Sequence, residues 1–235
     1  MAVKLVKPIN HKKVVKITNQ DFEAKMRELR VNSDIAVAVS GGPDSLALMH
    51  LSNRYALNNN INLTVLSIDH GIRAESSKEI VWLKKVAKKN KINFYSTKLK
   101  KKINSSNTLS KARTLRYEAL SKYCNKKKIK FLLTAHHLDD EIENFLMRLI
   151  RGSGVKGLSS LKVKSRYKNT KLILVRPLLE YSKKSLVAYL SEQKQVYIND
   201  RTNYNNKYDR SRIRKLSQQL ILSLIHISEP TRLGF

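Results

Sequence analysis

Short apolar segments alternate with longer segments of helical periodicity along most of this chain. The apolar segments are rich in Val, Ile and Leu, as expected of strands buried on both faces. Strands that alternate with helices predict right-handed β-α-β units, and therefore a doubly wound α/β fold with a parallel sheet. We predict strands at residues 34–40, 62–69, 92–99, 130–135 and 172–176, and helices at residues 45–57, 76–90, 108–127 and 138–151.

Functional residues in such a sheet lie at the carboxyl ends of the strands, so here they should follow Val39, Ile68 and Thr134. The chain has 235 residues, of which 41% are hydrophobic, and can bury one sizeable core. The segment 152–169 is rich in Gly, Ser and Lys, which predicts a mobile basic loop without a domain boundary.

A glycine-containing loop joins the first predicted strand to the helix that follows it. It consists of Ser40, Gly41, Gly42, Pro43, Asp44 and Ser45. At such a junction, backbone N–H groups and the positive end of the helix can hold a phosphate, which glycine lets the backbone approach closely. A carboxylate beside a polyphosphate makes sense mainly when Mg²⁺ lies between them, so Asp44 is the first candidate metal ligand. The alternative for the isolated motif is a turn with a helix cap.

The chain carries 47 Lys and Arg residues against 18 Asp and Glu residues, a formal net charge of +29. This excess favours a polyanionic partner, with nucleic acid as the first interpretation. An AT-rich genome also raises Lys content without any functional demand, and charge runs alone do not distinguish RNA from a membrane surface. The charge therefore supports nucleic acid only together with specific motifs.

Cys124 is the only cysteine among the 235 residues, which excludes an internal disulfide and a cysteine-ligated metal cluster within this sequence. Residues 1–17 show no signal-peptide core, and no apolar stretch has the length of a membrane span. We therefore expect a cytoplasmic protein without a membrane partner.

Further polar motifs stand at the ends of the predicted strands and on the neighbouring helices. They are Asp69-His70-Gly71-Ile72-Arg73 with Ser76, Ala112-Arg113 with Arg116-Tyr117, Ala135-His136-His137-Leu138-Asp139-Asp140-Glu141-Ile142-Glu143, Arg176-Pro177-Leu178-Leu179, and Arg210-Ser211-Arg212-Ile213-Arg214. Together with the glycine loop, these motifs resemble the tRNA(Ile)-lysidine synthases, a family of the N-type ATP pyrophosphatase (PP-loop) superfamily. The resemblance covers residues 34–216, and Glu141, Asn144 and Ser211 depart from its usual residues.

The resemblance implies a set of site residues. The residues expected to bind the nucleotide are Ser40, Gly41, Gly42, Pro43, Asp44, Ser45, Asp69, His70 and Arg113. The residues expected to act in catalysis are Asp44, His136, Asp140 and Arg210. The expected Mg²⁺ ligands are Asp44 and Asp140. Taken alone, the residues around His136 and Asp140 are more often a helix cap with an acidic first turn, and arginines on helices are more often surface charges.

The resemblance also implies a reaction and its partners. The wobble cytidine of tRNA(Ile) with a CAU anticodon would attack the α-phosphate of ATP, and the amine of free L-lysine would then displace AMP to give lysidine. ATP and Mg²⁺ are the expected co-substrate and cofactor, Asp140 and Glu143 would hold the lysine, and a homodimer is compatible with the family.

Three other interpretations compete with this one. A tRNA 2-thiocytidine synthetase shares the loop and the histidine motif but resembles a cysteine-dependent iron–sulfur family, which the single Cys124 disfavours. An ammonia-dependent amidotransferase would keep the loop but fits the other motifs poorly. A catalytically inactive tRNA-binding fragment is the third, because the family often carries a C-terminal tRNA-recognition domain that we expect to be absent here.

We expect residues 1–33 to form an N-terminal extension with a first helix, and residues 34–221 to form the PP-loop catalytic domain. Residues 222–232 (LSLIHISEPTR) resemble the in-frame translation of a transposon adapter used in sequencing libraries. We therefore expect the natural sequence to continue differently after about Ile221, and we set residues 222–235 aside as an artefactual tail.

Overall fold

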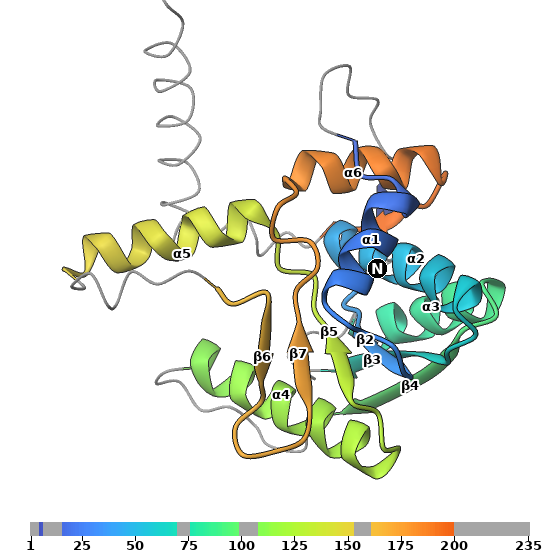
Figure 1. Cartoon of the computed structure of the whole chain (residues 1–235), viewed down its shortest axis with the longest axis horizontal. Coiled ribbons are helices and arrows are strands. Elements are labelled where there is room, and N and C mark those ends of the chain that lie inside the picture. Colours follow the sequence, from blue (N-terminus) through green and yellow to red (C-terminus); the bar gives the residue numbers. More distant parts are fainter. Residues whose placement is uncertain (1–4, 7–15, 70–75, 99–107, 153–160, 200–235) are drawn as a thin grey trace, which may run out of the picture. The chain divides into compact units, whose positions relative to one another are not determined.

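A six-stranded sheet with the order β4-β3-β2-β5-β7-β6 organises the computed structural model, which describes residues 5–6, 16–69, 76–98, 108–152 and 161–199 (Figure 1). All neighbouring strands pair in parallel except β6, which runs antiparallel to β7. The predicted doubly wound α/β fold is confirmed, with an antiparallel edge strand added. The strands are β2 (Ile35–Ala38), β3 (Leu63–Asp69), β4 (Asn93–Lys98), β5 (Phe131–Leu133), β6 (Lys164–Arg166) and β7 (Ile173–Val175).

The chain divides into two compact units. The first comprises Met1–His137 and Lys162–Asn199, and the second comprises Leu138–Leu161 and Asp200–Phe235. Besides the sheet, the first unit contains a small antiparallel pair, β1 (Leu5–Val6) with β8 (Tyr197–Ile198). Its helices are α1 (Asn19–Glu28), α2 (Pro43–Asn58), α3 (Ser76–Lys89), α4 (Thr108–Lys126) and α6 (Lys183–Glu192), whereas α5 (Leu138–Ile150) belongs to the second unit.

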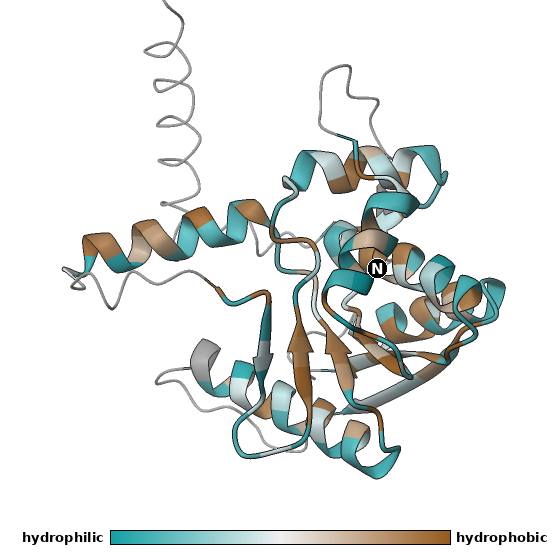
Figure 2. Cartoon of the chain, viewed as in Figure 1, coloured by the Kyte–Doolittle hydropathy of each residue, from teal (hydrophilic) through white to brown (hydrophobic). Residues whose placement is uncertain are grey.

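The two faces of the sheet bury separate apolar cores because successive side chains of a strand point to opposite sides. On β2, Ile35 and Val37 belong to the core shared with α1, α2 and α6, whereas Ala36 belongs to the core shared with α4. On β5, Leu133 and Leu132 divide in the same way. Apolar residues accordingly concentrate on β5 and β7 (Figure 2), and α4 covers the face opposite to α1, α2 and α6 (Figure 1).

Helix α2 is the most enclosed helix of this arrangement. Leu46, Leu48 and Leu51 have almost no exposed surface, since the helix packs on the sheet and is covered by α1 and α6. Its start follows from Pro43 at the first helical position, where the missing N–H would have had no partner in the helix. The helix that follows the glycine loop is therefore rigidly held.

The segment 152–169, predicted as a mobile basic loop, contains β6 in its described part. Lys164, Ser165 and Arg166 pair with β7, and the N–H of Arg176 donates to Val163 O at 2.7 Å. The loop prediction was wrong for these residues because three polar side chains show no strand periodicity, whereas the open edge of β7 supplies their partners. In the described part of the chain, every helix is too short or too polar to cross a bilayer.

Candidate active site

The glycine loop lies where the strand order reverses. The chain passes from β2 through α2 to β3 on one side, while β5 pairs with β2 on the other side. The carboxyl ends of β2 and β5 are therefore neighbours. Crevices at such switch points are the usual ligand sites of doubly wound sheets. As expected from sequence, residues following Val39 and Thr134 meet at this edge.

Gly41 adopts a conformation that would be strained with any other residue. Its φ is +90°, and a Cβ atom at this position would stand 2.5 Å from Cδ1 of Ile198. The N–H of Ile198 also donates to Gly41 O at 2.9 Å. Strand β8 thus packs directly against the loop and holds its backbone in place.

The first turn of α2 is held by hydroxyl groups and is open at its end. Gly42 is the N-cap residue and makes no side-chain cap hydrogen bond. Ser45 Oγ donates to Gly42 O at 3.0 Å and accepts from the N–H of Ser40 at 3.2 Å. Because no side chain caps this turn, its N–H groups and the helix dipole are available to a phosphate.

Asp44 lies beside this open end with 23% of its side chain exposed. Its Oδ2 is 3.5 Å from Nε2 of His137 and 3.8 Å from Nζ of Lys183. Its Oδ1 is buried and accepts no hydrogen bond in the described structure. A buried carboxylate oxygen without a donor suits a cation ligand.

The site around Asp44 fits Mg²⁺ better than a metal held by protein alone. Among the described residues, no three His, Cys, Asp or Glu side chains gather closely enough to hold a metal ion. Mg²⁺ is usually bound through one or two carboxylates together with substrate phosphates and water. Asp44 beside the phosphate loop has the required chemistry.

His137 and Lys183 lie at the site but were not predicted from the sequence as site residues. His137 has only 2% of its surface exposed, and its position in the His-His pair was the available signal. Lys183 begins α6 directly after the N-cap Ser182, and no motif marked it. Its approach to Asp44 depends on how α6 packs against α2.

His136 connects β5 to α4 through two hydrogen bonds. Its Nε2 is 3.1 Å from a guanidinium nitrogen of Arg113, and its Nδ1 is 3.0 Å from Oγ1 of Thr134. Since guanidinium only donates, Nε2 must accept, and in the neutral ring Nδ1 then carries the proton and donates to Thr134. His136 thereby orients Arg113.

The remaining predicted residues are distributed over the structure as follows. Asp69 ends β3, is 9% exposed, and accepts a hydrogen bond of 3.3 Å from Ser77 Oγ. Asp140 stands in the acidic first turn of α5, in the second unit. His70, Arg210 and the suspected tail 222–235 lie outside the described residues.

Cys124 lies on α4 with no exposed surface, within the core between α4 and the sheet. Burial raises the pKa of its thiol to about 12. A thiolate ligand or nucleophile needs a lowered pKa and access to its partner. Cys124 is therefore a packing residue.

An uncapped glycine loop at the switch point of a doubly wound sheet defines a phosphate-binding α/β domain. A model of the PP-loop domain family matches residues 11–220, and this chain belongs to that family. The chain is 45% identical over 183 residues to the tRNA(Ile)-lysidine synthase of Rickettsia bellii (strain OSU 85-389), a match that covers 78% of this chain and 42% of the relative. The corresponding protein of Rickettsia typhi (strain ATCC VR-144 / Wilmington) is 40% identical over 199 residues, covering 83% and 46%.

These relatives confirm the resemblance that the sequence motifs predicted. The chain spans less than half of the length of either relative. Among solved structures, the U34-tRNA thiolase NcsA from Methanococcus maripaludis with its [4Fe-4S] cluster matches with a TM-score of 0.72 at 23% identity, covering 87% of this chain and 73% of the thiolase. NMN synthetase from Francisella tularensis matches with a TM-score of 0.53 at 11% identity, covering 87% of each chain. At these identities the likeness concerns the fold.

Proposed function

We propose that this chain is the catalytic part of an enzyme that ligates lysine to C2 of the wobble cytidine of tRNA(Ile) with a CAU anticodon, using ATP. The observation that carries the proposal is the open glycine loop with Asp44 beside it, in a chain 45% identical to a tRNA(Ile)-lysidine synthase. The net charge of +29 supports a polyanionic substrate.

The nucleotide would bind across the carboxyl edge of the sheet. Its phosphates would accept hydrogen bonds from Ser40, Ser45 and backbone N–H groups of the loop. Asp69, which ends β3, and Arg113, which is bonded to His136 after β5, would line the nucleotide site. His70, which lies outside the described residues, is included on the family resemblance alone. Lys183, 3.8 Å from Asp44, would supply the positive charge that this loop lacks among its own residues.

Asp44 is the proposed Mg²⁺ ligand of the first unit, and the family resemblance adds Asp140 of the second unit as a further candidate. Bound Mg²⁺ would neutralise developing charge on the phosphates during ATP cleavage. Asp44 contributes the buried Oδ1, and His137 and Lys183 keep the rest of the carboxylate in one orientation.

In the first step, O2 of the cytidine attacks the α-phosphorus of ATP. The O2–P bond forms, the bond from the α-phosphorus to the bridging oxygen breaks, and pyrophosphate leaves. Arg113 and Arg210 would stabilise the negative charge of the transition state. His136 would hold the Arg113 guanidinium towards the reacting phosphate through the 3.1 Å contact.

In the second step, the lysine amine attacks C2 of the activated base. The new C2–N bond forms, the C2–O2 bond breaks, and AMP leaves with O2 while the amine proton passes to solvent. Asp140 and Glu143 would hold the cationic lysine through their carboxylates.

Turnover of ATP to AMP with transcribed tRNA(Ile) and labelled lysine tests the proposal. The chain and its Asp44→Asn variant should be compared at several Mg²⁺ concentrations, with Asp34→Asn as the matched control. Asp34 lies at the amino end of β2, where it bonds Asn62, so the control removes one carboxylate charge away from the loop.

We expect label to enter tRNA with the parent chain and the control, and at least a hundredfold less with Asp44→Asn. Pyrophosphate release without lysine incorporation would indicate another reaction of the PP-loop class. Binding of tRNA without any ATP cleavage would indicate an inactive fragment.

A further inference from the structure

Two arginines lie over the aromatic ring of Tyr117, and a third is near enough for its charge to interact with Tyr117. The guanidinium carbon of Arg113 is 5.3 Å from the ring centroid, and that of Arg116 is 5.5 Å from it. Arg176, the first residue after β7, lies close enough for its charge to interact with Tyr117 and Arg113. We call Arg113, Arg116 and Arg176 the arginine cluster.

The charges of the arginine cluster are poorly compensated. Burial lowers the pKa of Arg116, and the positive charge of Arg113 adds to this effect, while Tyr117 partly offsets it. Burial likewise lowers the pKa of Arg176, again with a contribution from Arg113. In the described part of the chain, no carboxylate forms an ion pair or a hydrogen bond with any of the three.

Arg176 has a donor that no protein group uses. Only 8% of its surface is exposed. One terminal nitrogen donates to Lys162 O at 2.7 Å and to Ser165 Oγ at 3.2 Å, which fixes the guanidinium against β6. Its Nε is buried and has no partner in the described structure. Buried donors are nearly always satisfied, so this one indicates a missing acceptor.

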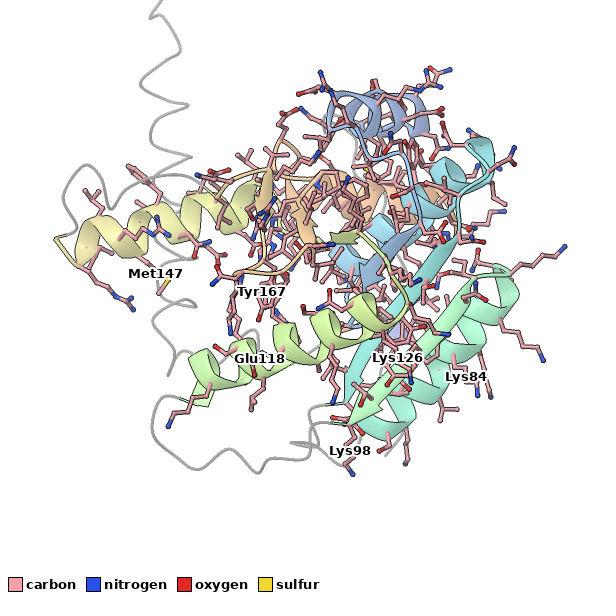
Figure 3. All side chains as sticks on the ribbon, turned by 60° about the horizontal axis from the view of Figure 1, so that its bottom comes forward. Lys84, Lys98, Glu118, Lys126, Met147 and Tyr167 are labelled. Atoms are coloured by element: carbon pink, nitrogen blue, oxygen red, sulfur yellow. The ribbon has the colours of Figure 1, made fainter. Side chains whose placement is uncertain are left out.

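Further positive charge lies on the elements that cover or border the α4 face of the sheet. Tyr167, from the turn after β6, stacks on Tyr117 with ring centroids 5.9 Å apart. Lys168 pairs with Glu118 on α4. Tyr167 and Glu118 are labelled in Figure 3. Glu118 is the only acidic residue of α4. Exposed basic residues on α4, β6 and the adjoining turns are Lys111, Lys122, Lys126, Lys127, Lys128, Lys130, Arg166, Lys168 and Lys171.

We propose that the arginine cluster binds a phosphodiester group of the RNA substrate. Phosphate oxygens would accept from Arg113 and Arg116, for which bidentate guanidinium geometry is well suited, and the charge of Arg176 would add to the positive potential. The inference rests on the proposed function for the identity of the RNA. An RNA backbone explains the run of exposed lysines on this face, whereas a nucleotide bound to the glycine loop leaves them without a role.

Arg113 joins the two sites, because it belongs to the cluster and is also bonded to His136. The proposed reaction requires RNA and nucleotide to meet, since a base atom attacks the α-phosphorus. A guanidinium held between the two phosphate sites would keep the reacting groups together.

Fluorescence anisotropy with labelled tRNA(Ile) transcript over a series of salt concentrations tests this site. The variants are Arg116→Gln, Arg116→Lys and, as the matched control, Lys84→Gln on the exposed side of α3 (Figure 3). We expect Arg116→Gln to weaken binding about tenfold and to lower the slope of log K against log salt by about 0.7 to 0.9. Arg116→Lys should weaken it less, and Lys84→Gln by less than about twofold.

Circular dichroism and thermal unfolding of each variant check that the fold is retained, and ATP affinity is measured in parallel. Equal RNA affinity for Arg116→Gln and Lys84→Gln, or no RNA binding by the parent chain at low salt, would overturn the inference. Lower ATP affinity with unchanged RNA binding would assign the cluster to the nucleotide and overturn it as well. RNA binding is measured without turnover. Its outcome therefore does not depend on whether the chain ligates lysine.

Discussion

Ile198 packs against Gly41 of the phosphate loop. Its N–H donates to Gly41 O at 2.9 Å, and its Cδ1 occupies the space of the missing Cβ. A strand near the end of the described chain therefore fixes the conformation of a loop near its beginning. The loop is held in shape before any phosphate binds.

Gly41→Ala should deform this loop. The substitution combines a φ of +90° with a contact of 2.5 Å, so we expect the free energy of unfolding to fall by about 1 to 3 kcal/mol and ATP affinity to fall with it. Gly42→Ala is the control for stability, because its Cβ would meet only Ser40 Oγ at 3.8 Å. Urea unfolding of both variants checks the difference, and equal destabilisation would contradict it.

Thr134→Val should disturb the orientation of His136. The variant keeps the shape of the side chain but removes the acceptor 3.0 Å from Nδ1. Thr134 is 5% exposed, so water cannot easily replace the hydroxyl, and we expect a stability loss of about 1 to 2 kcal/mol. We also expect kcat to fall several-fold with little change in the KM for ATP, since Arg113 would lose its fixed position.

Steady-state kinetics with Thr134→Ser as the control measures this effect, because serine restores the hydroxyl. If serine and valine variants behaved alike, packing rather than the hydrogen bond would explain the loss. An unchanged kcat in both would exclude a positioning role for Thr134.

His50 should make the stability of the fold depend on pH. Burial lowers the pKa of His50, and the positive charge of Lys89 lowers it further. The 3.2 Å hydrogen bond between His50 and Gln195 acts in the opposite direction but is a smaller effect than burial. The unfolded chain therefore binds the proton more readily than the folded chain. Stability from this residue is present above the unfolded pKa of about 6.5 and is lost as the pH falls towards the lower folded value.

Urea unfolding at pH values from 7.5 to about 5 measures this dependence. The free energy of unfolding of the parent chain should fall more steeply than that of His50→Gln, which cannot take up the proton. Parallel curves for the two proteins would show that His50 titrates alike in both states.

Cys124 should be inert in the folded protein. Its thiol has no exposed surface, and burial raises its pKa to about 12. A thiol reagent at pH 7 should therefore react only at the rate of unfolding, with full reaction in urea. Cys124→Ala should leave ATP turnover within about twofold, whereas a loss of turnover without a loss of stability would favour a cysteine-dependent reaction.

The apolar alternation was sufficient to predict the sheet, the helices between its strands and the position of the phosphate loop. Each of these depends on local periodicity or on a short motif, such as Gly41-Gly42-Pro43 between a buried strand and a helix. Strand β6 was not predicted, because its polar residues become a strand only by pairing with the open edge of β7.

The sequence by itself determined the residue types of the candidate site and their order along the chain. Only the tertiary structure decided which residues meet: Lys183 and His137 at Asp44, Ile198 at Gly41, and Tyr167 at Tyr117. These contacts join residues far apart in the chain. They depend on how α6, β8 and the β6–β7 pair pack around the sheet, and local periodicity carries no information about that packing.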